Sequence, residues 1–161
     1  MKRTATSKGK LQRTPEEAEN SLIDLFAIVY SGTLDQMIEK YGKKAFNIAR
    51  KGFIDSMVKA NIEEFTKIKD KSLEAYIEWL LSAITAGHRY EIIENEDDSV
   101  RLRFTHCPWA NYFKEIGKPK IGKFFCDTDG PLAAAFNNKI KFKITKTLMD
   151  GDDYCNHHFF I

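Results

Sequence analysis

The sequence predicts an α+β fold, in which N-terminal helices pack on a C-terminal antiparallel sheet of about four strands with two short helices inserted between its hairpins. Three observations predict this class. Apolar residues recur at helical spacing from about residue 14 to residue 88, apolar and polar residues alternate in short runs after Gly87, and no internal repeat interrupts the pattern. At 161 residues the chain has the length of one domain, which we expect to span residues 14–161.

The first helix has a clear start signal. The segment Thr14–Glu17 has the pattern of a capping box, with a threonine N-cap, a proline at the first helical position and a glutamate that reaches back. Apolar residues follow at helical spacing as far as Ser31–Gly32, where we expect an interruption. A second helical stretch begins near Thr33 and is predicted to break at Tyr41–Gly42.

Helical spacing continues over the next 45 residues. An apolar stripe runs from Ala45 to Val58, and the charged residues 61–72 are interpreted as a frayed helix end or a loop. A further helix is predicted from Ser72 to about Ala86, where Gly87 is placed to end it.

After this glycine the period changes to two, which is typical of half-buried strands. Residues 90–94 and 100–105 form a predicted hairpin around a polar turn. Residues 139–144 alternate lysine with apolar side chains, and residues 154–161 return as a final strand. Between the hairpins we expect two short helices, residues 108–116 and about 121–127, and then a turn at residues 132–136.

The net charge of +2 conceals an uneven distribution. Residues 1–13 carry five basic and no acidic side chains, which leaves 20 basic and 23 acidic side chains, or −3, for the rest. We interpret residues 1–13 as a disordered tail and expect no nucleic-acid partner. The basic start is followed by no apolar segment, and no apolar run is long enough to span a membrane, so we expect a cytoplasmic protein.

Three cysteines, Cys107, Cys126 and Cys155, are the main candidates for chemistry. An odd number of cysteines without an export signal predicts free thiols rather than a disulfide framework. Their spacing matches no compact zinc motif, so we expect no cofactor, with a soft metal bound by all three thiols as the alternative. Cys107 precedes Pro108 at a predicted strand–helix junction, where a helix dipole would lower its pKa. The alternative is a small buried residue.

Further candidates lie around the other two cysteines. Cys155 and His157 point to the same face of the final strand, where they could flank a substrate or belong to the core. Asp127 and Asp129 follow Cys126, and either could act as an acid, a base or a turn residue. On the hairpin, Arg103 could bind a small carboxylate. We interpret the remaining polar candidates as a helix cap at His88 and solvated side chains at Asn156 and His158.

Several of these residues together resemble the L-2-amino-thiazoline-4-carboxylic acid hydrolase family. The likeness covers most of residues 20–161, and its specific elements lie in the final 55. They are Cys107-Pro108-Trp109, Gly117, Phe125-Cys126-x-x-Asp129, Phe136-Asn137, Thr145-x-Thr147-Leu148-Met149-x-Gly151 and Cys155, with Tyr41-Gly42-x-x-Ala45 in the helical half. Asn138 departs from the proline often found there, and Asn156 and His157 replace an acid and an aromatic residue.

The resemblance implies hydrolytic opening of a 2-aminothiazoline ring to a carbamoyl-cysteine. The amidine-like carbon is attacked by water or a thiolate, a leaving sulfur or nitrogen is protonated, and the substrate carboxylate is held. We expect Cys107 as nucleophile, Asp129 as acid/base and Cys155 in the catalytic pocket. Four substrate-binding positions are expected at Cys126, Arg103, His157 and Asn137.

Two other classes of function remain open. One is a non-catalytic domain that senses a small molecule or a metal, since the sheet with inserted helices is also similar to ligand-binding vinyl-reductase-type domains. The other is a protein–protein adaptor that forms a homodimer through its helices. We expect the three sulfurs to converge on one cavity if the chain is an enzyme.

Overall fold

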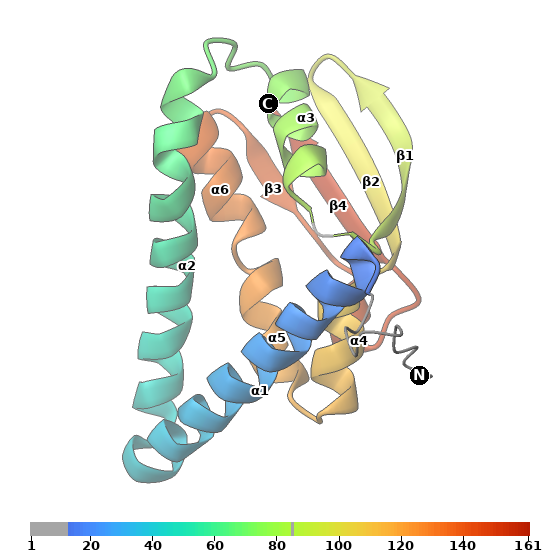
Figure 1. Ribbon diagram of the computed structural model, residues 1–161. Helices are drawn as coiled ribbons and strands as arrows, with labels where there is room; N and C mark the ends of the chain where they lie inside the picture. The colour runs from blue at the N-terminus through green and yellow to red at the C-terminus, as the bar shows by residue number, and fades with distance from the viewer. Residues whose placement is uncertain (1–12, 85) are drawn as a thin grey trace.

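The computed structural model describes residues 13–84 and 86–161, so the predicted tail lies, apart from Arg13, outside the described residues. Helices come first and a four-stranded antiparallel sheet follows, with short helices between its two hairpins (Figure 1). The predicted α+β class is therefore confirmed.

Two long helices form a V whose arms meet at Gly42 (Figure 1). The first, α1 (Pro15–Tyr41), begins with the predicted capping box. Glu17 N donates to Thr14 Oγ1 at 3.1 Å, and Thr14 N donates to Glu17 Oε2 at 3.0 Å. Gly42 has a φ of 66°, a conformation that glycine adopts without a steric penalty, so the chain turns there into α2 (Lys43–Lys67).

The first long helix runs further than predicted, and the end of the second decides between two alternatives. The interruption expected at Ser31–Gly32 is wrong, because Ala27, Ser31 and Leu34 are all buried along one side of α1 and hold it helical through the glycine. This packing outweighs the roughly 1 kcal/mol that a glycine costs inside a helix. At the end of α2, Phe65 is buried against Trp79 with ring centroids 4.6 Å apart. That contact keeps residues 61–67 helical, so the helix-end alternative for the charged segment is correct as far as Lys67.

The third helix, α3 (Leu73–Ala83), begins where expected and ends earlier. Ser72 is its N-cap, and its hydroxyl accepts a hydrogen bond from Ala75 N at 3.1 Å. The chain then leaves the helix before Gly87, whose φ of 86° leads it into the sheet.

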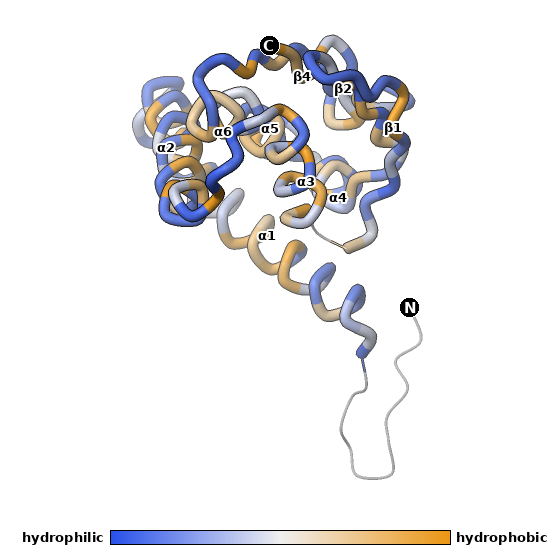
Figure 2. The backbone as a smooth tube through the Cα atoms, turned by 90° about the horizontal axis from the view of Figure 1, so that it is seen from above, coloured by the Kyte–Doolittle hydropathy of each residue, from blue (hydrophilic) through white to orange (hydrophobic). Residues whose placement is uncertain are grey.

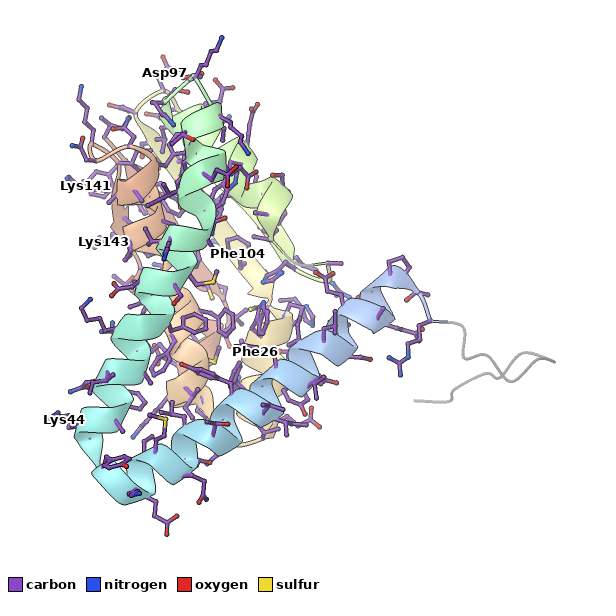
Figure 3. All side chains as sticks on the ribbon, turned by 60° about the vertical axis from the view of Figure 1, so that its left-hand side comes forward. Phe26, Lys44, Asp97, Phe104, Lys141 and Lys143 are labelled. Atoms are coloured by element: carbon purple, nitrogen blue, oxygen red, sulfur yellow. The ribbon has the colours of Figure 1, made fainter. Side chains whose placement is uncertain are left out.

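The sheet has the strand order β1-β2-β4-β3, and each neighbouring pair is antiparallel. Its strands are β1 (Arg89–Glu96), β2 (Ser99–His106), β3 (Lys141–Lys143) and β4 (Cys155–Phe160). Both predicted hairpins are present, although β3 is shorter than expected. Phe104 points toward the helices, whereas Lys141 and Lys143 extend away from them (Figure 3). One face of the sheet is therefore covered.

Three short α-helices lie between the hairpins, one more than predicted. They are α4 (Pro108–Glu115), α5 (Pro119–Cys126) and α6 (Asp129–Phe136), and a 3-10 turn, η1 (Leu148–Asp150), precedes β4. The expected turn at residues 132–136 is part of α6, because Leu132, Ala133 and Phe136 are buried at helical spacing.

The buried side chains form two clusters. A sheet core contains Tyr76, Leu102 and Phe159 and lies between α3, α6 and the strands. A helix core contains Phe113 and Phe124 and lies between α1, α4 and α5. The border between the two cores is where the candidate site is found.

Candidate functional site

A cavity of about 240 Å³ opens at the border between the sheet core and the helix core. Its walls come from α2, α3, β2, all three short helices, η1 and β4. The lining residues are Met57, Leu80, Ala83, Ile84, His88, Phe104, Cys107, Trp109, Phe125, Cys126, Thr128, Asp129, Met149, Cys155 and His157.

All three cysteines line this cavity. Cys107 follows the last residue of β2 and is the N-cap position of α4, Cys126 is the last residue of α5, and Cys155 is the first residue of β4. The described residues contain no disulfide between them. The prediction that the three cysteines lie around one cavity is therefore confirmed.

The environment of Cys107 differs from the one predicted. Burial raises the pKa of the Cys107 thiol to about 11, although the backbone N–H groups of Ala110 and Trp109 act in the opposite direction. The side chain makes no capping hydrogen bond to α4. The expected lowering of the pKa is wrong because the loss of water outweighs the partial charges at the helix N-terminus.

The other two thiols are also held in their neutral form. Burial, followed by repulsion from Asp129, raises the pKa of Cys126 well above its ordinary value. Burial likewise raises the pKa of Cys155, while a hydrogen bond from Leu148 N to Cys155 Sγ at 3.2 Å opposes that rise. Cys155 therefore has a backbone donor that would stabilise a thiolate.

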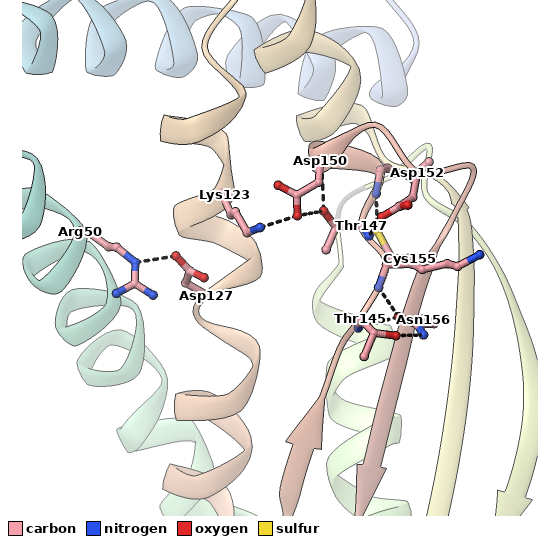
Figure 4. A network of polar contacts seen from close by, with 11 residues as sticks. Arg50, Lys123, Asp127, Thr145, Thr147, Asp150, Asp152, Cys155 and Asn156 are labelled. Atoms are coloured by element: carbon pink, nitrogen blue, oxygen red, sulfur yellow. Dashed lines mark hydrogen bonds and ion pairs between the residues drawn. The ribbon is translucent and has the colours of Figure 1, made fainter.

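That donor is positioned by a network of polar contacts around η1 (Figure 4). Thr147 N donates to Asp152 Oδ2 at 2.7 Å, and Thr147 Oγ1 donates to Asp150 Oδ2 at 2.9 Å. Lys123 forms an ion pair with Asp150 and so connects this turn to α5. The run from Thr145 to Gly151 thus fixes the turn that holds Cys155 and places Met149 in the cavity wall.

A carboxyl group and an imidazole meet beside the thiols. Asp129 Oδ2 lies 3.8 Å from His157 Nδ1, and their side chains are only 15% and 12% exposed. Burial, with a smaller contribution from Asp127, raises the pKa of Asp129 to about 8. Burial, with a contribution from His88, lowers the pKa of His157 to about 4. At neutral pH the two groups are therefore a protonated acid and a neutral imidazole, and their close approach is not an ion pair.

His157 is oriented by aromatic neighbours. Its ring centroid lies 4.8 Å from that of Phe104 and 5.3 Å from that of Phe142. Within the described part of the chain, Nδ1 is buried and has no hydrogen-bond partner. An imidazole nitrogen with an unused hydrogen-bonding capacity thus faces the acid and the cavity.

Two predicted binding residues lie elsewhere. Arg103 is on the opposite face of β2 from Phe104, where its guanidinium lies 3.8 Å from Glu91 and 4.9 Å from the ring of Tyr154. Asn137 ends α6, and its amide donates to Lys71 O at 2.7 Å and accepts from Lys139 N at 3.0 Å. Neither residue lines the cavity. Strand alternation turns Arg103 away from the cavity, and the hydrogen bonds to Lys71 and Lys139 occupy the Asn137 amide.

Five polar or aromatic residues that line the cavity had no predicted role in the site: His88, Phe104, Trp109, Phe125 and Thr128. His88 was interpreted as a helix cap, Thr128 was given no role, and Trp109 entered only as part of a motif. Trp109 stacks on Phe125 with ring centroids 4.0 Å apart. Trp109 and Thr128 each follow a candidate cysteine by two positions, and that proximity could have pointed to them, whereas His88 has no such neighbour in the sequence.

The cavity has no basic side chain of the lysine or arginine type among its described lining residues. Across residues 13–84 and 86–161, no group of three or more His, Cys, Asp or Glu side chains is arranged to hold a metal ion. In the same ranges, none of the helices combines the length and apolar composition needed to cross a bilayer.

Comparison with known proteins identifies a family and a fold. The family described as L-2-amino-thiazoline-4-carboxylic acid hydrolase matches residues 24–159. No curated protein matches the chain. Among solved structures, the chain is similar to a trafficking protein particle complex subunit 3 from Naegleria fowleri covalently bound to palmitic acid, at 14% identity and a TM-score of 0.53 over 88% of this chain and 96% of that one.

A second solved structure is similar at the level of fold. It is the phenol-responsive sensory domain of the transcription activator PoxR with phenol, at 10% identity and a TM-score of 0.50 over 98% of this chain and 83% of that one. At such low identity, both likenesses establish the shared fold alone.

Proposed function

We propose, from the premise that the chain belongs to the L-2-amino-thiazoline-4-carboxylic acid hydrolase family, that its cysteine-lined cavity is a hydrolytic active site. The substrate is a small cyclic amidine of the 2-aminothiazoline type, which is opened to a carbamoyl-cysteine. One observation carries the proposal. Three thiols, a protonated carboxyl group and a neutral imidazole line a single cavity of about 240 Å³.

Cys107 is the proposed nucleophile. Its sulfur attacks the ring carbon between nitrogen and sulfur, the ring C–S bond breaks, and a covalent isothiourea forms on the enzyme. Water then adds to the same carbon, and the Cys107 sulfur leaves to give the carbamoyl product. The backbone N–H groups of Trp109 and Ala110 stabilise the thiolate that forms when Cys107 loses its proton.

Asp129 and His157 are the proposed proton donor and acceptor. The thiol proton passes to the neutral imidazole, and the protonated Asp129 carboxyl donates its own proton to the leaving sulfur. The 3.8 Å pair is then a carboxylate facing an imidazolium, so the two charges created by the reaction stabilise each other. Water that attacks the covalent intermediate returns one proton to Asp129, and the departing thiolate recovers the proton held by His157.

Cys126 and Cys155 contact the substrate in this proposal without forming a bond to it. They are the remaining sulfurs of the cavity wall, and burial keeps both as neutral thiols. The substrate carboxylate meets no lysine or arginine among the described lining residues. We therefore expect the amidine, rather than the carboxylate, to determine recognition.

The test is whether purified protein turns over 2-aminothiazoline-4-carboxylate, and turnover is monitored through the thiol that ring opening releases. Cys107→Ser should lower kcat by about 1,000-fold or more, whereas Cys126→Ser, the matched thiol control, should lower it by less than about 10-fold. Full ring-opening activity in Cys107→Ser would exclude the nucleophile role. The analogue 2-aminothiazoline, which lacks the carboxylate, should react with kcat/KM within about 10-fold of the acid.

A second candidate function is the binding of a small apolar molecule without turnover. The predominantly apolar and aromatic walls of the cavity favour it. Stoichiometric binding of the aminothiazoline in calorimetry, with no product thiol after prolonged incubation, would support this candidate against the hydrolase.

A further inference from the structure

Helix α1 is apolar on two sides, and only one of them is used by the fold. Its inner side carries Ile23, Ala27 and Leu34, which are buried. Its opposite side exposes Leu22 by 66%, Leu25 by 59% and Val29 by 57%. A helix that is hydrophobic around its whole circumference is normally buried on both sides, so the outer side of α1 lacks a partner among residues 13–84 and 86–161.

These exposed residues follow a regular spacing. Ala18, Leu22, Leu25, Val29 and Gly32, here called the outer stripe, are separated by four, three, four and three positions. This is the spacing with which one helix packs along another in a coiled coil. Viewed from above, α1 stands apart from the layers of the molecule, with apolar residues along its middle (Figure 2). The outer stripe therefore has the form of a helix-pairing seam.

We propose that the outer stripe is a homodimer interface, in which α1 of a second copy of this chain packs antiparallel across a two-fold axis at Leu25. In this arrangement residues whose numbers add to about 50 lie opposite each other. Leu25 then meets its own copy, Leu22 meets Val29, and the small residues Ala18 and Gly32 face each other at the two ends. The stripe is thus complementary to itself, as a two-fold interface requires.

The ends of the stripe have room for this approach. A Cβ placed on Gly32 would meet no atom within 4 Å, so the backbone of α1 is open to a neighbour at that position. Small residues at both ends let two helices come close while Leu25 fills the centre. A large side chain at either end would instead hold the helices apart.

The exposed area is sufficient for a stable dimer. A specific interface must bury about 1,000 Å² in total, or about 500 Å² from each copy. Aliphatic and aromatic side chains of this size each bury on the order of 100 Å². The exposed apolar side chains on and beside the stripe are Leu22, Leu25, Ile28 and Val29, about 400 Å² at this value, and the exposed Ala18, Gly32 and flanking polar residues of α1 supply the remainder.

Sedimentation velocity of the whole chain tests the interface. The wild-type chain is expected to sediment as a dimer of about 37 kDa, twice the 18.6 kDa of one chain. Leu25→Glu should raise the dimer dissociation constant at least about 100-fold, because two carboxylates would face each other at the axis. Ile62→Glu is the matched control, since Ile62 is 48% exposed on α2 and lies outside the stripe. This variant should remain a dimer.

A cross-link tests the geometry without relying on the charge change. Under mild oxidation, Leu25→Cys should form a disulfide between two copies, whereas Ile62→Cys and the wild-type chain should not. A monomeric wild-type chain at micromolar concentration would overturn the proposal, and so would a folded Leu25→Glu variant that remains dimeric. A monomer that binds lipid vesicles through α1 would assign the stripe to a membrane surface and equally overturn it.

Discussion

The two faces of the sheet are built from the same strands and have opposite chemistry. His157 and His158 are consecutive residues of β4, yet His157 faces the cavity, and its Nδ1 has no hydrogen-bond partner in the part of the chain that the structure describes. His158 lies on the outer face with Nε2 at 3.1 Å from Ser99 Oγ. Phe104 and Arg103 differ in the same way on β2. The comparison shows that burial on the inner face shifts the pKa values of ionisable side chains toward their neutral forms. On the outer face, charged side chains stay charged and pair with neighbouring residues.

The largest expected difference between the faces is in folding stability. Phe104→Ala should lower the free energy of unfolding by about 3–5 kcal/mol, because it removes a buried ring from the sheet core. Arg103→Ala, one position away on the outer face, should change it by less than about 1 kcal/mol, since its pair with Glu91 is exposed. Urea unfolding of both variants measures this. Similar losses for the two would contradict the comparison.

The second difference concerns pH. Folded Asp129 keeps its proton up to about pH 8, whereas the unfolded group loses it near its ordinary pKa of 3.8. Stability therefore falls as the pH rises between these values. His157, with a folded pKa of about 4, opposes this fall only below its ordinary pKa of 6.5. Between pH 6.5 and 8 the Asp129 effect should remain alone, at about 1–2 kcal/mol in a side chain that keeps some exposure.

Asp129→Asn should remove this dependence, because asparagine resembles the protonated acid and carries no ionisable proton. Thermal unfolding of the variant should give a flatter profile between pH 6.5 and 8 and a higher Tm at the upper end. The control is Asp127→Asn, which removes a carboxylate that pairs with Arg50 at 2.6 Å and should leave most of the slope in place, because burial is the larger cause of the raised Asp129 pKa. If the pH dependence of stability persisted in Asp129→Asn, it would have to arise from other groups.

The smallest expected difference between the two faces is in the titration of their histidines, and it can be measured on the wild-type chain. Burial lowers the pKa of both histidines, and His157 should titrate near pH 4. For His158, burial and the nearby charge of Arg101 lower the pKa, while Glu94 acts against that shift. An NMR titration of the imidazole signals should therefore resolve His158 at higher pH than His157. The reverse order would show that the cavity admits enough water to solvate a charged imidazole.

Local patterns predicted the elements of the fold well. The capping box at Thr14, the break at Gly42 and both hairpins depend on interactions within a few residues, and such interactions can be identified in the sequence. The continuation of α1 through Gly32 could not be predicted in this way. It depends on packing against elements more than 70 residues away, since the helix core joins α1 to α4 and α5.

The candidate site was predictable in part of its membership and not in its electrostatics. The motif and the alternation of β4 brought Cys107, Cys126, Cys155, Asp129 and His157 together correctly as neighbours of one cavity. The direction of the Cys107 pKa was wrong because the sequence shows the helix N-terminus and does not show how much water burial removes. Arg103 was misplaced because a charged residue on a hairpin was considered without the direction of its neighbour Phe104.

The walls of the cavity come from eight different elements, from Met57 on α2 to His157 on β4. A fragment that lacks any one of these elements does not contain the complete cavity, because its removal opens a side. A ligand bound in the cavity therefore stabilises the whole folded protein. At a free ligand concentration of one hundred times the dissociation constant, it should raise the free energy of unfolding by about 2.7 kcal/mol. Screening small molecules by the upward displacement of the melting temperature thus provides a route to the occupant that assumes nothing about its reaction.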